Sequence, residues 1–213
     1  MHVARQAAEA LAAVGTAPWT AYDDGYLSAY QWAGALAGGA SLPQEQTPAP
    51  LGPGEVAHAR FAPVGVSGYF GEDAQYRKSF FLIGGPVGLA LTGAASLAHN
   101  ASKKAEAERK AIPRWHRLGT AEILVTSQRL LASGNGQAGS FWYAEAGPLQ
   151  LMAGPGGVPA AQFQPSGQPV LRLESALAPL LYVFVHHLVD GRPPGVPLPP
   201  GLLDRARAQG RLR

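Results

Sequence analysis

TAEILVTSQRLLASGNGQAGSFWYAEA, residues 120–146, is the stretch that decides the fold. Apolar residues recur at every second position of 120–126, which is the period of a β-strand with one buried face. A second strand is expected over 127–133 and a third over 140–146. Between these two, an Asn-Gly pair supplies the positive φ angles that tight hairpin turns need. The stretch therefore predicts consecutive antiparallel strands.

Strand patterns continue on both sides of this stretch. Downstream, apolar segments at 149–153, 160–163 and 170–174 are separated by Gly/Pro turns. Upstream, EVAHARFA alternates with a period of two and predicts a strand over 55–63, and YRKSFFLI predicts another over 76–83. Short strands at roughly ten-residue spacing are typical of a sandwich or small barrel of antiparallel strands.

Helices are expected at both ends of the run of strands. Two are predicted within residues 1–38, the second capped by Asp23 or Asp24, because a carboxylate accepts hydrogen bonds from the free N–H groups of a first turn. After the last strand, 175–190 has the pattern of an amphipathic helix, capped by Ser175, that would close the end of a small barrel. The expected plan is an N-terminal helical segment (1–38), a Pro/Gly-rich linker (39–54), a β domain (55–190) and a Pro-rich basic tail (191–213).

SFFLIGGPVGLALTGAASLA, residues 79–98, contains no charged residue and is bracketed by basic ones. Its length approaches the roughly 20 apolar residues of a membrane span, but glycines, a proline and hydroxyl residues dilute it. A single crossing would also put the strand at 55–63 and the later strands on opposite sides of the membrane, where they could not pair. We therefore favour an inserted apolar helix over about 84–111, with a true span as the alternative.

Every fourth residue in the first half of this helix is small, and such a ridge lets another backbone approach closely. The ridge would be a dimer face in a membrane, or a packing face against protein in a soluble domain. We predict contacts with a membrane, a partner or a second copy through apolar, small and basic residues, which are Phe80, Phe81, Leu82, Gly84, Gly88, Leu89, Leu91, Thr92, Ser96, Lys103 and Lys104.

The composition excludes several classes of function. The 213 residues include no cysteine, which removes disulfides, thiolate nucleophiles and sulfur-based zinc sites. A net charge of +3 is too small to predict nucleic-acid binding. The sequence contains no nucleophile elbow, phosphate loop or dinucleotide fingerprint, and His186 with Asp190 would make only half a metal site. We therefore predict no catalytic residue, cofactor or metal.

Three segments together resemble the bacterial PH-like domains, in particular the GRAM-like families of actinobacteria. They are LGPGEVAHARFA at 51–62, LGTAEILVTSQRLLASG at 118–134 and FWYAEAG at 141–147. They share a "GE" strand opening, a hairpin with the pattern G-x-x-x-x-x-T-x-x-R-L-L, and an aromatic strand after it. The resemblance implies an α+β fold: a PH-like small antiparallel barrel or sandwich with a closing C-terminal helix, an inserted apolar helix and N-terminal helices.

The same resemblance implies a non-catalytic binding or scaffolding module, because PH-like domains mostly bind lipids, peptides or partner proteins. The apolar insertion and its basic flanks add an anionic lipid surface as the expected partner, at the cytoplasmic face of a membrane. One alternative is a soluble protein–protein interaction component or homo-oligomer that buries the apolar helix. A second is a single-span membrane protein with a cytoplasmic β domain, and a third is an enzyme of unrecognised type.

Overall fold

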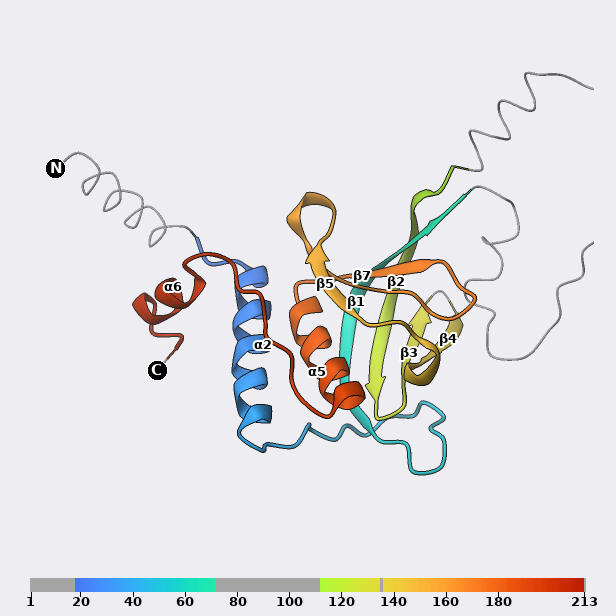
Figure 1. Ribbon diagram of the computed structural model, residues 1–213, viewed down its shortest axis with the longest axis horizontal. Helices are drawn as coiled ribbons and strands as arrows, with labels where there is room; N and C mark the ends of the chain where they lie inside the picture. The colour runs from blue at the N-terminus through green and yellow to red at the C-terminus, as the bar shows by residue number, and fades with distance from the viewer. Residues whose placement is uncertain (1–17, 72–111, 135, 213) are drawn as a thin grey trace, which may run out of the picture. The chain divides into compact units, whose positions relative to one another are not determined.

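The computed structural model describes residues 18–71, 112–134 and 136–212. Its seven strands form one antiparallel sheet in the order β4-β3-β2-β1-β7-β6-β5, and this part of the chain does not close the sheet into a barrel. The same residues contain three α-helices, so the predicted α+β class is confirmed (Figure 1). The predicted strand at 76–83 and the inserted helix lie outside the described residues.

The strands overlap the predicted positions, but the strand expected over 120–126 begins six residues earlier, at 114, and the one expected over 140–146 covers 137–142. They are β1 (Ala57–Phe70), β2 (Arg114–Thr126), β3 (Arg129–Gly134), β4 (Gln137–Trp142), β5 (Gln150–Ala153), β6 (Pro159–Phe163) and β7 (Val170–Glu174). β1 runs seven residues beyond the predicted end at 63. Its extension includes Val64–Gly68, which is buried at every position, so the alternation that marks a half-buried strand is absent there.

β1 and β2 form the longest ladder of the sheet, and Figure 1 shows them side by side. Their antiparallel register pairs Phe61 with Ile123 near one end and Phe70 with Arg114 at the other. The chain therefore leaves β1 and re-enters β2 at adjacent points. A single membrane crossing between them would require these points to be on opposite sides of the bilayer, so the pairing disfavours the single-span alternative. Within the described residues, no helix is long and apolar enough to cross a bilayer.

The chain divides into two compact units. The first consists of Met1–Leu42, Leu149–Ala161 and Glu174–Arg213, and the second of Pro43–Pro148 and Gln162–Leu173. The core of the second unit is built from alternate residues of its strands, which is the expected result of the period-two pattern. Its buried apolar side chains are Ala57, Phe61, Val64, Val66, Phe70, Ala121, Ile123, Leu124, Val125, Leu130, Ala132, Phe163, Leu171 and Leu173.

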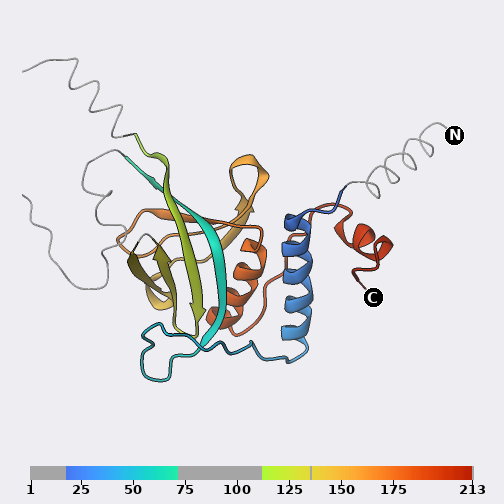
Figure 2. The same ribbon diagram turned by 180° about the vertical axis from the view of Figure 1, so that it is seen from behind.

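In the first unit, helices α2 (Ala21–Ala37) and α5 (Ala178–Asp190) pack side by side, as Figure 2 shows. Trp32 of α2 meets Phe184 of α5 edge to face, with ring centroids 5.2 Å apart, an arrangement that aromatic pairs prefer. Gly25 lets the helix approach the chain before α5, because a Cβ at this position would lie 1.8 Å from the Ala176 carbonyl oxygen.

The helix caps differ in detail from the predicted ones. α2 begins earlier than expected because Thr20, and not an aspartate, is its N-cap. The Thr20 hydroxyl accepts a hydrogen bond from the Asp23 N–H at 3.2 Å, and the Asp23 carboxylate accepts one from the Thr20 N–H at 2.9 Å. This is a capping box. α5 has Leu177 at its N-cap, without a side-chain hydrogen bond, and ends at Gly191 with φ 69°.

The C-terminal arginines are held by acids of the same unit. A short helix, α6 (Leu202–Ala208), brings Arg205 to an ion pair with Asp23 of α2. Arg211 pairs with Asp24 at 2.9 Å, and its guanidinium carbon lies 4.6 Å from the centre of the Trp19 ring. These contacts offset the positive charge of the two arginines, so the C-terminal segment is a weaker attractant for anionic lipid than its composition suggests.

Candidate functional site

The predicted contact residues Phe80, Phe81, Leu82, Gly84, Gly88, Leu89, Leu91, Thr92, Ser96, Lys103 and Lys104 all lie outside the described residues. The structure therefore brings none of them together and separates none of them. The described residues do define the two points at which this interval joins the sheet, and those points carry the candidate site.

An aromatic–basic patch, formed by Tyr69, Ile112, Trp115, Arg117 and Arg172, lies where β1 ends and β2 begins. Tyr69 and Trp115 are opposite each other in the register, with ring centroids 5.4 Å apart. The Arg172 guanidinium carbon lies 3.6 Å from the centre of the Trp115 ring. At this distance the cation is attracted to the face of the ring, which also orients both side chains.

Strand geometry explains why the strand residues of the patch share one face; Ile112 lies two residues before β2 and is adjacent to them in sequence. Successive side chains of a strand point to opposite faces of the sheet, so Trp115 and Arg117 point the same way and His116 points the other way. On that opposite face the His116 ring stacks on buried Phe70, with centroids 4.4 Å apart. The inner contact fixes the outer end of the ladder and thereby holds the patch in place.

The patch is accessible and combines apolar with cationic groups. Tyr69 is 42% exposed and Ile112 is 62% exposed, and Arg117 also lies at the surface. The Nε atom of Arg172 is buried and has no hydrogen-bond partner among the described groups, so the face of Trp115 is a main neighbour of its charge. Aromatic rings beside basic side chains are typical of protein segments at a lipid headgroup layer.

A second feature gathers residues from the segments that carry the PH-like resemblance. We call this feature the polar clamp, and it consists of Glu55, Thr126, Arg129 and Tyr143. The Glu55 carboxylate lies at its centre, where Oε1 and Oε2 accept hydrogen bonds from Nε and Nη2 of Arg129, each at 2.9 Å. The Thr126 hydroxyl donates to Glu55 Oε1 at 2.6 Å. The Tyr143 hydroxyl donates to the Thr126 carbonyl at 3.0 Å. The "GE" and "T-x-x-R" elements of the sequence thus meet in one cluster.

The clamp satisfies its own groups. Arg129 also donates to the Ser140 hydroxyl at 3.0 Å and the Pro50 carbonyl at 3.1 Å, and its guanidinium carbon lies 4.5 Å from the centre of the Trp142 ring. The Glu55 side chain is completely buried. With nearly every donor and acceptor occupied, the cluster has little capacity for a ligand, and its chemistry is that of a structural cross-link between the linker and the β2–β3 hairpin.

The titration behaviour of the clamp agrees with its geometry. Burial alone would raise the pKa of Glu55, but hydrogen bonds from Arg129, the Gly52 N–H and Thr126, with the charge of Arg129, outweigh burial and lower the pKa from 4.5 to about 2. Burial, aided by the negative charge of Glu55, raises the pKa of Tyr143. Both groups therefore keep one protonation state across the physiological range.

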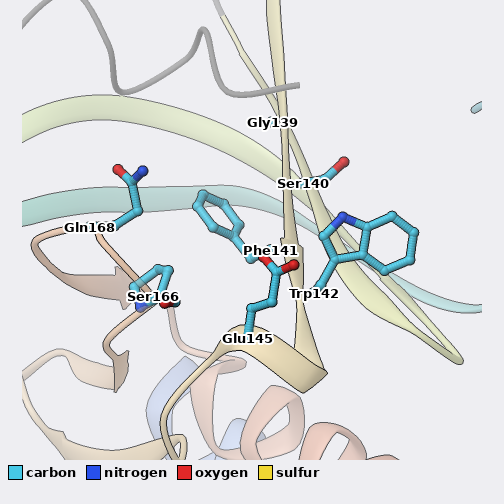
Figure 3. A pocket seen from close by; sticks show the side chains of 8 residues that line it. Gly139, Ser140, Phe141, Trp142, Glu145, Ser166 and Gln168 are labelled. Atoms are coloured by element: carbon cyan, nitrogen blue, oxygen red, sulfur yellow. The ribbon is translucent and has the colours of Figure 1, made fainter. Parts of the chain in front are cut away.

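A small hollow lies next to the clamp, between the outer side of β4 and the turn before β7 (Figure 3). In Figure 3, Phe141 points toward the segment that carries Ser166 and Gln168, Glu145 points along β4, and Trp142 points away from that segment. The hollow has a volume of about 60 Å³. Its lining offers hydroxyl, amide and carboxylate groups, but no cation and no imidazole.

The described residues contain no group of three or more His, Asp or Glu side chains that could hold a metal ion. His186 and Asp190 do meet, with Nδ1 and Oδ2 2.7 Å apart, while His186 Nε2 lies 2.7 Å from the Leu149 carbonyl oxygen. Both ring nitrogens are thus engaged in contacts that link α5 to the start of β5.

No protein-family model, curated protein or solved structure matches the chain.

Sequence reasoning missed the patch, although a signal for it exists. Tyr69 and Trp115 lie outside the apolar stretch on its two flanks, as aromatic residues do when they mark the interfacial ends of a membrane-facing segment. Arg172 could not be associated with them, because only the neighbouring position of β1 and β7 brings it near.

Proposed function

We propose that this protein is a non-catalytic binding module of PH-like type that attaches peripherally to an anionic membrane surface. The aromatic–basic patch carries the proposal. It presents an exposed tyrosine and isoleucine next to Trp115 and two arginines, at the adjacent points where the chain leaves β1 and enters β2; the sequence between these points includes the apolar stretch 79–98.

Two physical contributions support this function. Burial of exposed apolar and aromatic groups at the headgroup layer contributes about 25 cal/mol per Å² of apolar area. Each arginine near an anionic surface adds about 1 kcal/mol at physiological salt. Neither contribution alone gives stable attachment, but together they act at one site.

The PH-like assignment rests on the order of the elements. Seven strands in one antiparallel sheet are followed in sequence by the amphipathic helix α5, and the residues of the resemblance meet in the polar clamp. A cytoplasmic position at the inner face of the membrane is part of the same proposal, because the anionic lipids of that leaflet are the surface that basic residues recognise.

Vesicle co-sedimentation tests the proposal. The wild-type protein is expected to sediment with vesicles of phosphatidylcholine and phosphatidylserine, and much less with phosphatidylcholine alone. Tyr69→Ser should weaken binding to the mixed vesicles several-fold, because it removes the exposed aromatic group of the patch. Tyr22→Ser is the matched control, since Tyr22 is 38% exposed on α2 and lies outside the patch.

Two results would contradict the proposal: equal binding by both tyrosine variants, or a wild-type protein that stays in the supernatant with every vesicle. The second result, with a single monodisperse species in the absence of detergent, would favour the soluble interaction component instead.

A further inference from the structure

β4 is the last strand of the sheet, and its outer edge pairs with no other described strand. Natural sheets commonly protect such an edge with a charged residue, a proline or a bulge. The sequence of β4, QAGSFW, has no charged residue and no proline. Its register with β3 is continuous over six residue pairs, from Arg129–Trp142 to Gly134–Gln137, without a bulge. The edge is therefore regular and able to pair with another extended chain.

Two hollows flank this edge. The hollow in Figure 3 contains Glu145, Ser166 and Gln168. The second has a volume of about 190 Å³ and is floored by apolar groups that include Leu124 and Leu131. Gly139 and Ser140 of β4 line both hollows.

An added strand would match this arrangement. Side chains of an extended chain point alternately to the two faces of the sheet that it joins, and peptides that add to a sheet edge gain affinity from main-chain hydrogen bonds and specificity from pockets for alternate side chains. A strand along β4 would direct one set of side chains toward Glu145 and the other set toward the apolar floor.

The charges in the hollows select the partner. Glu145 is exposed, and the other groups of its hollow are neutral, so this face favours a basic side chain. In the second hollow both arginines are already paired, Arg129 with Glu55 and Arg60 with Glu45 and Glu122. Arg60 faces two glutamates, so its cluster keeps one net negative charge, but this charge lies at β1 and β2, with β3 between it and β4. The part of this face nearest to β4 therefore offers apolar surface and no unpaired cation.

We propose that the outer edge of β4 binds an extended peptide segment of a partner protein as an added strand, with basic side chains toward Glu145 and apolar side chains on the opposite face. This interaction is additional to membrane attachment and uses none of the residues of the aromatic–basic patch.

The test uses the full chain and a short fluorescent peptide in which lysine alternates with valine or threonine, followed by anisotropy. Glu145→Lys should weaken binding about tenfold or more, because attraction becomes repulsion. Asp204→Lys, a change of another exposed acid, on α6, is the matched control and should leave binding unchanged. A second peptide carries glutamate in place of lysine. Its affinity for the wild-type protein should be as low as, or lower than, the affinity of the lysine peptide for Glu145→Lys.

Backbone methylation separates strand addition from simple charge attraction. Only alternate N–H groups of an added strand point to the sheet, so N-methylation of one alternate set should abolish binding and that of the other set should preserve it. Equal effects of both methylated sets, equal loss in both protein variants, or no binding of the lysine peptide would overturn the proposal. Concentration-dependent self-association would also overturn the proposal if Glu145→Lys did not change it and the peptide did not displace it. The edge of β4 would then bind a second copy of the chain. Vesicle binding by Glu145→Lys should stay at the wild-type level, which separates this proposal from the membrane proposal.

Discussion

At the scale of single residues, Glu55 is the most constrained group of the second unit. It is buried, it is ionised, and it holds Arg129, Thr126 and the Gly52 N–H in one hydrogen-bonded cluster. A buried ion pair adds little net stability relative to an apolar pair, but removal of one partner leaves the other charge buried and unpaired. Glu55 therefore fixes how the linker meets β1 and the β2–β3 hairpin.

The stability of the protein should fall in acid because of this residue. The pKa of Glu55 is lowered from 4.5 to about 2, so its contribution is fully present above about pH 4.5 and is lost as the pH falls toward 2. The shift corresponds to on the order of 3 kcal/mol. Urea unfolding from pH 6 to pH 2.5 should show this loss in the wild type, and Glu55→Gln should be less stable at pH 6 by a similar amount and lose much less in acid.

The matched control is Glu45→Gln. Glu45 also pairs with an arginine, Arg60, but both side chains of this pair are 31% exposed, and ion pairs near the surface contribute about 1 kcal/mol or less. If the two glutamine variants have the same stability at pH 6, the account of the clamp is wrong.

At the scale of elements, the approach of α2 to the chain before α5 depends on one small residue. Gly25 and Gly34 both belong to α2, but a Cβ at Gly25 would overlap the Ala176 carbonyl, whereas one at Gly34 would meet nothing within 4 Å. An alanine at Gly25 therefore tests the close packing of α2, whereas an alanine at Gly34 tests helix propensity alone.

Alanine at these two positions should have opposite effects. Gly25→Ala should lower the melting temperature, because relief of the overlap moves α2 or the backbone at Ala176, at a cost of about 1–3 kcal/mol or more. Gly34→Ala should raise the melting temperature, because alanine is more favourable than glycine in a helix and should increase the free energy of unfolding by up to about 1 kcal/mol. Thermal unfolding followed by circular dichroism measures both, and a shift of the same sign in the two variants would contradict the packing described for α2.

The elements also show how far sequence patterns reach. Alternation located the second half of β2 and most of the later strands, because one face of each is buried. It located only the first half of β1, because Val64–Gly68 is buried on both faces. The prediction of an aspartate N-cap for α2 is wrong, because Asp23 is the third residue of a capping box whose N-cap is Thr20. The partners of Arg205 and Arg211 could not be predicted, since Asp23 and Asp24 lie far away in the sequence.

At the scale of the whole molecule, the proposed function depends on the pairing of β1 with β2. This pairing places Tyr69 beside Trp115 and makes the two ends of the intervening sequence neighbours. The sequence contains an uncharged stretch between these two strands, and the prediction made for that stretch lies outside the described residues. The sequence could not identify the patch, because the patch depends on strand register and on Arg172 from a strand that follows much later in the chain.

Vesicle binding should depend on salt in a graded way. The Debye length falls from about 10 Å at 0.1 M salt to about 3 Å at 1 M, so attraction of Arg117 and Arg172 to anionic lipid should weaken over this range. Apolar contacts of Tyr69 and Ile112 should persist. Co-sedimentation across a salt series is expected to show a several-fold loss of binding with a remaining fraction. Binding that is independent of salt would contradict the basic part of the patch.

The most direct measurement uses the absence of cysteine from the chain. A single cysteine can be introduced as Ile112→Cys in the patch, or as Gln46→Cys in the linker, where the neighbouring Glu45 N–H donates to the Ala57 carbonyl at the far end of β1. Each variant carries the same polarity-sensitive fluorophore and is mixed with phosphatidylserine vesicles. We predict a blue shift for the label at 112 and none for the label at 46; a shift at 46 alone, equal shifts, or no shift at 112 would contradict attachment through the aromatic–basic patch.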